Sequence, residues 1–79
     1  MSQEKIKAVL KAHGKLSVDV DSLDEDSDLY SSGLTSLTTV NVMLAIEDEF
    51  DVEFSDDMLG RKTFQSIGAL QDAIETLLA

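Results

Sequence analysis

The sequence predicts an all-α fold: a small bundle of three to four helices, with a long loop between the first and second helices and a short third helix. Three stretches place apolar residues at helical spacing, proline is absent, and the chain has only 79 residues. A chain of this length buries roughly 60–65% of its unfolded surface. We therefore expect residues 1–79 to form a single domain around one thin core.

The first helix is expected near the N-terminus. Ile6, Val9, Leu10 and His13 follow the i, i+3, i+4, i+7 spacing of one helix face, and Gly14 ends the pattern. His13 would lie in the last turn, where a cation suits the helix dipole. We interpret this histidine as structural, since no catalytic partner lies near it in the sequence.

The central helix carries two adjoining apolar rows, a pattern typical of a helix that contacts several neighbours. The rows consist of Leu37, Val40 and Leu44 and, beside them, of Met43, Ile46 and Phe50. The last helix is predicted from a single apolar stripe, for which Ser66 is the expected N-cap. That stripe consists of Ile67, Leu70, Ile74, Leu77 and Leu78.

Two connections join these helices. The first, from Gly14 to Thr35, exceeds the roughly 12–15 residues usual for loops in compact domains, and loops of that length are often functional. Apolar residues along it would hold it against the core: Leu16, Val18, Val20, Leu23, Leu29 and Leu34. In the second connection, Ser55 is expected to cap one short helical turn that Gly60 ends.

Composition excludes several classes of protein. Sixteen acidic residues against six basic ones give a net charge of −10, which should repel nucleic acids and anionic membranes and favour partners with basic surfaces. With one His and no Cys, the chain cannot build a closed zinc site or a disulfide. No apolar run approaches the roughly 20 residues of a membrane helix, and no secretion signal is visible. We therefore expect a cytoplasmic protein that does not insert into membranes.

The acidic cluster from Asp19 to Asp28 invites a comparison with calcium-binding EF-hand loops, which need Gly at position six and Glu at position twelve. Counted from Asp24, these positions hold Leu29 and Thr35. Counted from Asp19 they also fail, so we predict no specific metal site. Weak divalent binding that relieves charge repulsion stays open.

One motif carries the functional prediction. Residues 28–37, Asp-Leu-Tyr-Ser-Ser-Gly-Leu-Thr-Ser-Leu, end the long loop and open the central helix, and an acidic stretch follows it. This arrangement resembles the acyl and peptidyl carrier protein family, in which a Gly-x-Asp-Ser-Leu motif starts the second of four helices. The resemblance covers nearly the whole chain, because helix number, loop length and total size also agree.

The resemblance implies that Ser36 carries a 4′-phosphopantetheine group, which a phosphopantetheinyl transferase moves from coenzyme A to the serine hydroxyl. Cargo is then held as a thioester on the terminal thiol of that arm. Gly33, Thr35 and Leu37 lie beside the attachment point: Gly33 allows a tight turn, and Leu37 would anchor the helix start. The placement is physically reasonable, because a phosphodiester at a helix N-terminus faces unpaired N–H groups and the positive end of the dipole.

Thr35 departs from the family pattern, which has Asp immediately before the modified serine. Threonine is still a competent N-cap, but the substitution removes a negative charge that a transferase or metal ion could recognise. We interpret the change as a sign of a specialised carrier rather than of the general fatty-acid one. Ser55 is a smaller departure, since many family members have Pro at that position.

The resemblance also implies a docking surface for partner enzymes. Seven acidic residues and no basic one lie between positions 47 and 57: Glu47, Asp48, Glu49, Asp51, Glu53, Asp56 and Asp57. In the family, such acids meet Arg and Lys on each partner, here a loading ligase for acyl or aminoacyl groups and the downstream transferases. The carrier itself is expected to be a monomer without catalytic activity.

Several alternatives remain open at this stage. The favoured cargo is an acyl-type group, and the alternative is an amino acid loaded by an adenylating ligase. A second alternative is an unmodified acidic adaptor with the same fold. Ser36 could be an ordinary helix-opening serine, and the acidic run could be only a solvated face. A cargo pocket within the bundle is expected near Val40, Met43, Leu44, Ile46, Leu59, Phe64 and Ile74.

Overall fold

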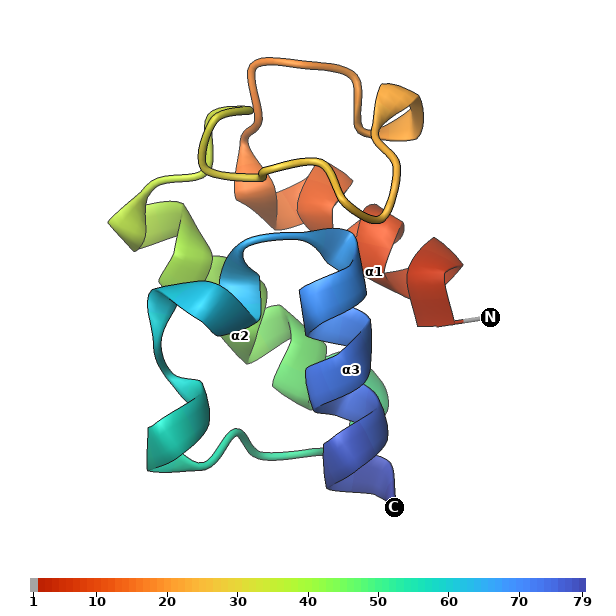
Figure 1. Cartoon of the computed structure of the whole chain (residues 1–79), viewed down its shortest axis with the longest axis vertical. Helices are drawn as coiled ribbons and strands as arrows, with labels where there is room; N and C mark the ends of the chain where they lie inside the picture. Colours follow the sequence, from red (N-terminus) through yellow and green to blue (C-terminus); the bar gives the residue numbers. More distant parts are fainter. Residues whose placement is uncertain (1) are drawn as a thin grey trace.

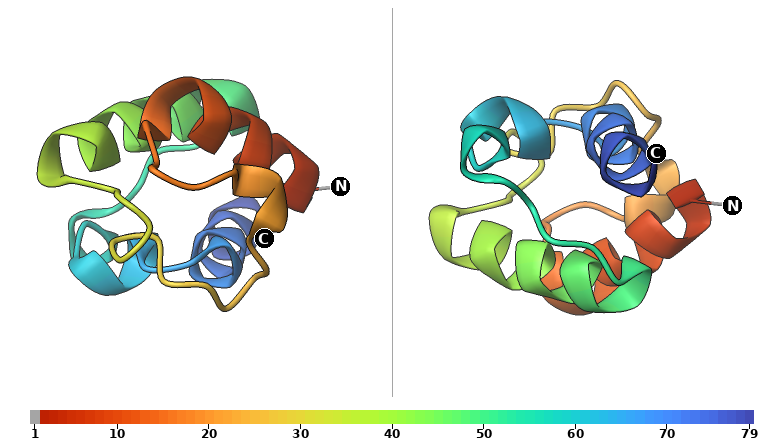
Figure 2. Two further views of the ribbon diagram at one scale, coloured as in Figure 1. Left: turned by 90° about the horizontal axis from the view of Figure 1, so that it is seen from above. Right: turned by 90° about the horizontal axis from the view of Figure 1, so that it is seen from below.

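The computed structural model describes residues 2–79, and within that range the chain forms three α-helices joined by loops and short turns, with no β-strand (Figure 1). Helix α1 spans Ser2–Val9, α2 spans Ser36–Phe50 and α3 spans Ile67–Leu78. The two end-on views of Figure 2 show these helices, and the turns between α2 and α3, arranged around a common centre. The prediction of an all-α bundle with a long first loop is confirmed.

One contiguous core fills the centre, and every helix and the long loop contribute to it. The rings of Phe54 and Phe64 add a tilted pair, with centroids 5.5 Å apart. The buried apolar residues are Ile6, Val9, Leu10, Val20, Leu29, Leu34, Val42, Ile46, Phe54, Phe64, Ile67, Leu70 and Ile74. Among the helices of the described residues, none combines the length and hydropathy that crossing a membrane requires.

The N-terminal helical region extends past α1 as a single wider turn, the π-helical segment Leu10–Gly14, and ends at Lys15 in the left-handed conformation. Burial of Ile6, Val9 and Leu10 confirms the predicted apolar face. His13 lies in the last turn of this segment, as expected, and is exposed.

The buried face of α2 agrees with the prediction for one of its two apolar rows: Ile46 is buried, and Met43 and Phe50 pack against the core. Thr38, Val42 and Ile46 point into the core, whereas the row Leu37, Val40 and Leu44 is 73%, 48% and 54% exposed. The expectation that this row packs on neighbouring helices is therefore wrong. Apolar side chains surround most of α2, so the pattern could not show which side faces the core.

The long first loop packs across the ends of the helices. Val20, Leu29 and Leu34 are buried as predicted, Leu16 and Leu23 are partly buried, and Val18 is exposed against expectation. Asp19 caps the 3₁₀ turn Val20–Ser22 within the loop. Two backbone hydrogen bonds tie the loop to the start of α3: Leu29 N–H donates to the Gln65 carbonyl over 2.7 Å, and Gly68 N–H donates to the Glu25 carbonyl over 2.9 Å.

Two 3₁₀ turns, Asp56–Met58 and Arg61–Phe64, connect α2 to α3. The first is the predicted short third helix, but Ser55 does not cap it through its side chain, because its hydroxyl donates to the Asp57 carboxylate over 2.6 Å. The second turn was not predicted. Ser66 caps α3 as expected, accepting a hydrogen bond from Ala69 N–H over 3.1 Å, while Leu78 at the other end is exposed.

Candidate functional site

Ser36 is the first residue of α2, and its side chain is exposed. Its hydroxyl makes no hydrogen bond to any group within residues 2–79, whereas two nearby serine hydroxyls are engaged. Ser31 Oγ donates to Asp28 Oδ2 over 3.0 Å, and Ser32 Oγ donates to the Asp28 carbonyl over 3.0 Å. Of the three serines around the motif, Ser36 thus offers the hydroxyl that is free to react.

The start of α2 is fixed by a capping box made of two threonines. Thr38 N–H donates to Thr35 Oγ1, and Thr35 N–H donates to Thr38 Oγ1, as the reciprocal pattern requires. The N–H groups of Ser36 and Leu37 find no acceptor in the described part of the chain. These two donors and the positive end of the helix dipole favour a negatively charged group on Ser36.

Gly33 sits in the turn that leads to Ser36, with a φ of +117° that L side chains rarely adopt. A Cβ atom at this position would lie 2.8 Å from the backbone nitrogen of Ser17. The N–H group of Ser17 donates a hydrogen bond to the Ser32 carbonyl over 2.9 Å, which keeps the two segments of the loop close together. The expected tight turn is therefore present, and close contact with an earlier part of the loop is a second reason for glycine.

The Asp28 carboxylate organises the beginning of this turn. Its oxygens accept hydrogen bonds from the Ser31 hydroxyl and from the N–H groups of Ser31 and Tyr30. The hydrogen bond from the Ser31 side chain is the largest cause that lowers the pKa of Asp28 below its ordinary value, and desolvation, the next largest effect, opposes it. The backbone hydrogen bonds and the charge of Arg61 lower the pKa further. Asp28 is thus held ionised as the anchor of the loop that presents Ser36.

A hollow of about 300 Å³ opens beside Ser36, between the start of α2 and the turn Arg61–Phe64. The residues along it include Tyr30, Thr39, Val40, Leu59, Arg61 and Phe64. Across it, the Arg61 guanidinium lies over the Tyr30 ring, with the Cζ atom 4.0 Å from the ring centroid. The hollow combines one cation with apolar walls, and it adjoins the free hydroxyl.

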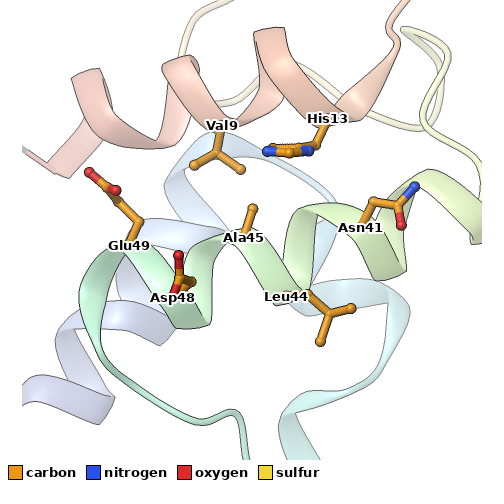
Figure 3. A pocket seen from close by; sticks show the side chains of 7 residues that line it. All are labelled: Val9, His13, Asn41, Leu44, Ala45, Asp48 and Glu49. Carbon is orange, nitrogen blue, oxygen red and sulfur yellow. The ribbon is translucent and has the colours of Figure 1, made fainter.

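The predicted cargo pocket is only partly recovered in this hollow. Val40, Leu59 and Phe64 line it, but Ile46 and Ile74 are completely buried in the core. Leu44 lines a different hollow of about 450 Å³, between α2 and the end of the first helical region. In that hollow, shown in Figure 3, Val9 and His13 point towards α2, while Leu44 points away from them.

An exposed apolar surface continues from Ser36 along α2. Leu37, Val40 and Leu44 form its row on the helix, and Leu59, which is 47% exposed, lies on the far side of the Ser36 hollow. The first ten residues of α2 carry no charge. The surface next to Ser36 along α2 is therefore apolar, a property that we did not predict because the row was assigned to the core.

The seven acids of the predicted docking surface differ in their surroundings. Asp48 and Glu49 line the hollow of Figure 3, and Asp51 ends α2 in the left-handed conformation. Glu47 is half-buried, and its Oε2 accepts a hydrogen bond from Phe54 N–H over 2.9 Å, which gives it a structural role. The others, Glu53, Asp56 and Asp57, are exposed in the connection that follows.

Sequence reasoning missed the Tyr30–Arg61 pair at the site. The two residues are separated by 31 positions, and no periodic pattern marks the turn that contains Arg61. The only available signal was the position of Arg61 and Lys62, the two basic residues that interrupt the acidic second half of the chain.

These features fit a covalent phosphopantetheine group. A free hydroxyl, unpaired N–H groups of Ser36 and Leu37, an adjacent guanidinium and an open hollow lie at one end of α2. Together they offer an attachment point, donors for a phosphodiester and space for the beginning of an arm.

Comparison with known proteins shows which family this sequence matches. Residues 5–74 match the family described as the phosphopantetheine attachment site. Among curated proteins, the aminoacyl carrier protein of Agrobacterium fabrum (strain C58 / ATCC 33970) is 42% identical over 73 residues, which cover 92% of this chain and 88% of that protein.

Solved structures agree as well. A carrier protein from Agrobacterium tumefaciens, complexed with an engineered Bradyrhizobium japonicum glycine:[carrier protein] ligase and ATP, matches with a TM-score of 0.93 and 39% identity, over 96% of this chain and 99% of that chain. A glycylated carrier protein in complex with the Bradyrhizobium japonicum ligase matches with a TM-score of 0.78 and 29% identity, over 91% and 96% of the two chains. The chain belongs to the family of acyl and peptidyl carrier proteins that bear covalently attached 4′-phosphopantetheine.

Proposed function

We propose that this carrier holds an amino acid as a thioester on 4′-phosphopantetheine attached to Ser36, and that it acts as a single monomeric domain over residues 1–79. The observation that supports the attachment point is the free Ser36 hydroxyl at the start of α2, beside two engaged serine hydroxyls. The bound group supplies the thiol on which the cargo is carried, because the chain contains no Cys.

The packing of the core supports a small polar cargo over a long acyl chain. Ile46, Leu70 and Ile74 have no exposed area, so a chain of methylenes entering there would have to displace tightly packed side chains. The hollow beside Ser36 is open to solvent. An aminoacyl thioester, which keeps its ammonium group in water, suits such a surface better than a fatty acyl group does.

We propose no catalytic activity for the carrier itself. A serine that attacks a substrate needs a base within hydrogen-bond reach of its hydroxyl, and none contacts Ser36 within residues 2–79. The base that removes the Ser36 proton during loading must therefore come from the phosphopantetheinyl transferase. The carrier contributes an accessible hydroxyl at a fixed position.

We propose that partners dock on two neighbouring zones of the surface. The apolar zone of Leu37, Val40, Leu44 and Leu59 lies next to Ser36 and would bury its area against the amino acid:[carrier protein] ligase and downstream transferases. The acids of α2 begin at Glu47, about 17 Å along the helix axis from Ser36 at 1.5 Å per residue. At that distance they would steer basic partners during encounter, an effect that acts on association rates more than on the final affinity.

The attachment point is tested by coexpression with a promiscuous phosphopantetheinyl transferase. Intact mass should increase by one phosphopantetheine in the parent and in Ser31→Ala and Ser32→Ala, and it should stay unchanged in Ser36→Ala. Modification of Ser36→Ala would contradict the assignment, and an unmodified parent would favour the adaptor alternative.

The cargo is tested with the modified protein. A glycine:[carrier protein] ligase, ATP and a panel of amino acids should add one aminoacyl group, and neutral hydroxylamine should remove it, since it cleaves thioesters. A fatty-acyl ligase with fatty acids should add nothing under the same conditions. Efficient fatty acylation without aminoacylation would replace the proposed cargo by an acyl group.

The two docking zones are separated by their kinetics with the ligase. Leu44→Ala should speed dissociation at every salt concentration, while Glu49→Lys should slow association at low salt only, because the Debye length falls from about 10 Å at 0.1 M to about 3 Å at 1 M. Glu47 is avoided because it also holds Phe54 N–H. An unchanged dissociation rate for Leu44→Ala would show that the apolar zone is not part of the interface.

A further inference from the structure

The charge around Ser36 poses a physical problem for the modified protein. A phosphodiester on Ser36 adds a negative charge to a chain that already has a net charge of −10. Four of its six basic residues lie within positions 5–15, and the other two are Arg61 and Lys62. Of these two, Arg61 lines the hollow next to Ser36.

The Arg61 side chain contacts the aromatic ring of Tyr30. The guanidinium carbon lies 4.0 Å from the centroid of the Tyr30 ring, and both residues line the same hollow as Ser36. Stacking on an aromatic face orients the guanidinium plane and leaves its in-plane N–H groups available. Those N–H groups donate to no acceptor within residues 2–79.

The carboxylate of Asp28 does not compete for the Arg61 N–H groups. Asp28 feels the charge of Arg61, but its oxygens accept hydrogen bonds from Ser31 and Tyr30, and no ion pair joins it to Arg61 in the described residues. A guanidinium that makes no ion pair within residues 2–79 therefore lines the same hollow as Ser36, whose own N–H group is unpaired. Charge-assisted bonds from such a fork suit a phosphodiester oxygen.

We propose that Arg61 is a positioning residue for the phosphodiester on Ser36, so that the arm begins along the Tyr30–Arg61 pair rather than extending directly into solvent. This inference rests on the proposed attachment at Ser36. A guanidinium that neutralises the phosphodiester lowers the electrostatic cost of modifying this acidic protein. It also sets the direction in which the cargo end of the arm leaves the surface.

The first experiment uses the unmutated protein before and after modification. In ¹H–¹⁵N spectra, the Arg61 Nε–H resonance should shift and exchange more slowly with water in the modified form, and the arm should show nuclear Overhauser contacts to the Tyr30 ring protons. An unchanged Arg61 resonance together with an arm that shows no contacts would overturn the proposal.

The second experiment compares apo and modified forms of the parent, Arg61→Gln, Arg61→Lys and Lys62→Gln. Modification should raise the unfolding equilibrium constant of Arg61→Gln about two- to fivefold relative to its effect on the parent. This is the size expected when an exposed ion pair is lost. Lys62→Gln, which removes the same charge outside the hollow, should follow the parent. Arg61→Lys should lie between, because it keeps the charge but loses the planar fork.

The outcomes separate the possible failures. Equal effects of Arg61→Gln and Lys62→Gln would mean that only net charge matters, which contradicts a specific role of Arg61. Failure of the proposed function itself would appear earlier, as a parent whose mass shows no phosphopantetheine on Ser36. Melting of each apo form shows whether a variant has lost its fold before modification is considered.

Discussion

Thr35 and Thr38 hold the start of α2 from both sides. Thr38 N–H donates to Thr35 Oγ1 over 3.2 Å, and Thr35 N–H donates to Thr38 Oγ1 over 2.9 Å. Thr38 is buried, so the pair anchors the first turn of the helix to the core. Ser36 lies between the two threonines in the sequence, so the capping box fixes its backbone, although its side chain is exposed.

The first prediction concerns Thr35, where the chain departs from the family pattern. Thr35→Ala should lower the free energy of unfolding by about 1 kcal/mol, the usual loss for a helix cap. Thr35→Asp should leave it nearly unchanged, because Asp also accepts the Thr38 N–H bond and adds a dipole interaction of about 0.3–1 kcal/mol, opposed by the net charge of −10. Urea denaturation of the three apo proteins measures both changes.

Loading rates complete this test. If the Asp of the family motif serves transferase recognition through its charge, Thr35→Asp should be modified faster than the parent by a general fatty-acid-type transferase. Thr35→Ala should show no such gain. Equal rates for Thr35→Asp and the parent would remove the case that Thr35 marks a specialised carrier.

The second prediction compares two glycines. Gly33→Ala should lower the free energy of unfolding by about 1–3 kcal/mol, because φ is +117° and the new Cβ would lie 2.8 Å from Ser17 N. Gly60→Ala meets nothing within 4 Å and has a φ of −92°, so it should be neutral or slightly stabilising. Thermal and urea melts of both variants measure the contrast. Similar losses at the two positions would contradict the close approach of Ser17.

The third prediction follows from the lowered pKa of Asp28, whose first cause is the hydrogen bond from the Ser31 hydroxyl. A carboxyl group with a lower pKa in the folded state stabilises that state above its unfolded pKa, near 3.9, and loses this contribution as the pH falls through the folded pKa. Asp28→Asn should therefore be less stable than the parent at pH 7, and the difference should shrink below about pH 4.

Asp26→Asn is the matched control for this experiment. It removes the same charge from an exposed carboxylate whose oxygens accept no hydrogen bond within residues 2–79. Urea denaturation of parent and both variants between pH 7 and pH 2.5 separates the Asp28 contribution from general charge repulsion. A stability difference for Asp28→Asn that stays constant over this range would contradict the prediction.

The fourth prediction concerns self-repulsion. With a net charge of −10 on 79 residues, the compact state should gain stability when charges are screened. The melting temperature should rise between low salt and about 0.5 M NaCl, and also with millimolar Mg²⁺. Melting temperatures that do not depend on ionic strength would show that the acids are too widely spaced to repel one another.

The three α-helices and the N-caps of α2 and α3 could be predicted because their signals are local. Ser66 and Thr35 precede apolar periodic segments and accept the hydrogen bonds expected of N-caps. The orientation of α2 could not be predicted in the same way. Both Val40 and Val42 fit an apolar face, and only packing against α1 and the π-turn decides that Val42 is buried.

Ser36, the proposed attachment point, and the turn before it could be found from the sequence, because Gly33 and Ser36 belong to one contiguous motif. The surroundings of Ser36 were not, because they come from distant segments. Tyr30 and Arg61 meet only when the long loop and the second 3₁₀ turn fold against each other. The split of the acids into structural and exposed groups likewise depends on contacts, such as that of Glu47 with Phe54 N–H.

The two backbone hydrogen bonds between the long loop and the start of α3 have a consequence for local unfolding. Because Leu29 N–H is bound to Gln65 and Gly68 N–H is bound to Glu25, neither segment can open without releasing the other. Residues 25–36 and the first turn of α3 should therefore exchange their amide hydrogens as one cooperative unit. A partner that displaces the loop before Ser36 would therefore also destabilise the first turn of α3, so docking near Ser36 would increase amide exchange in α3.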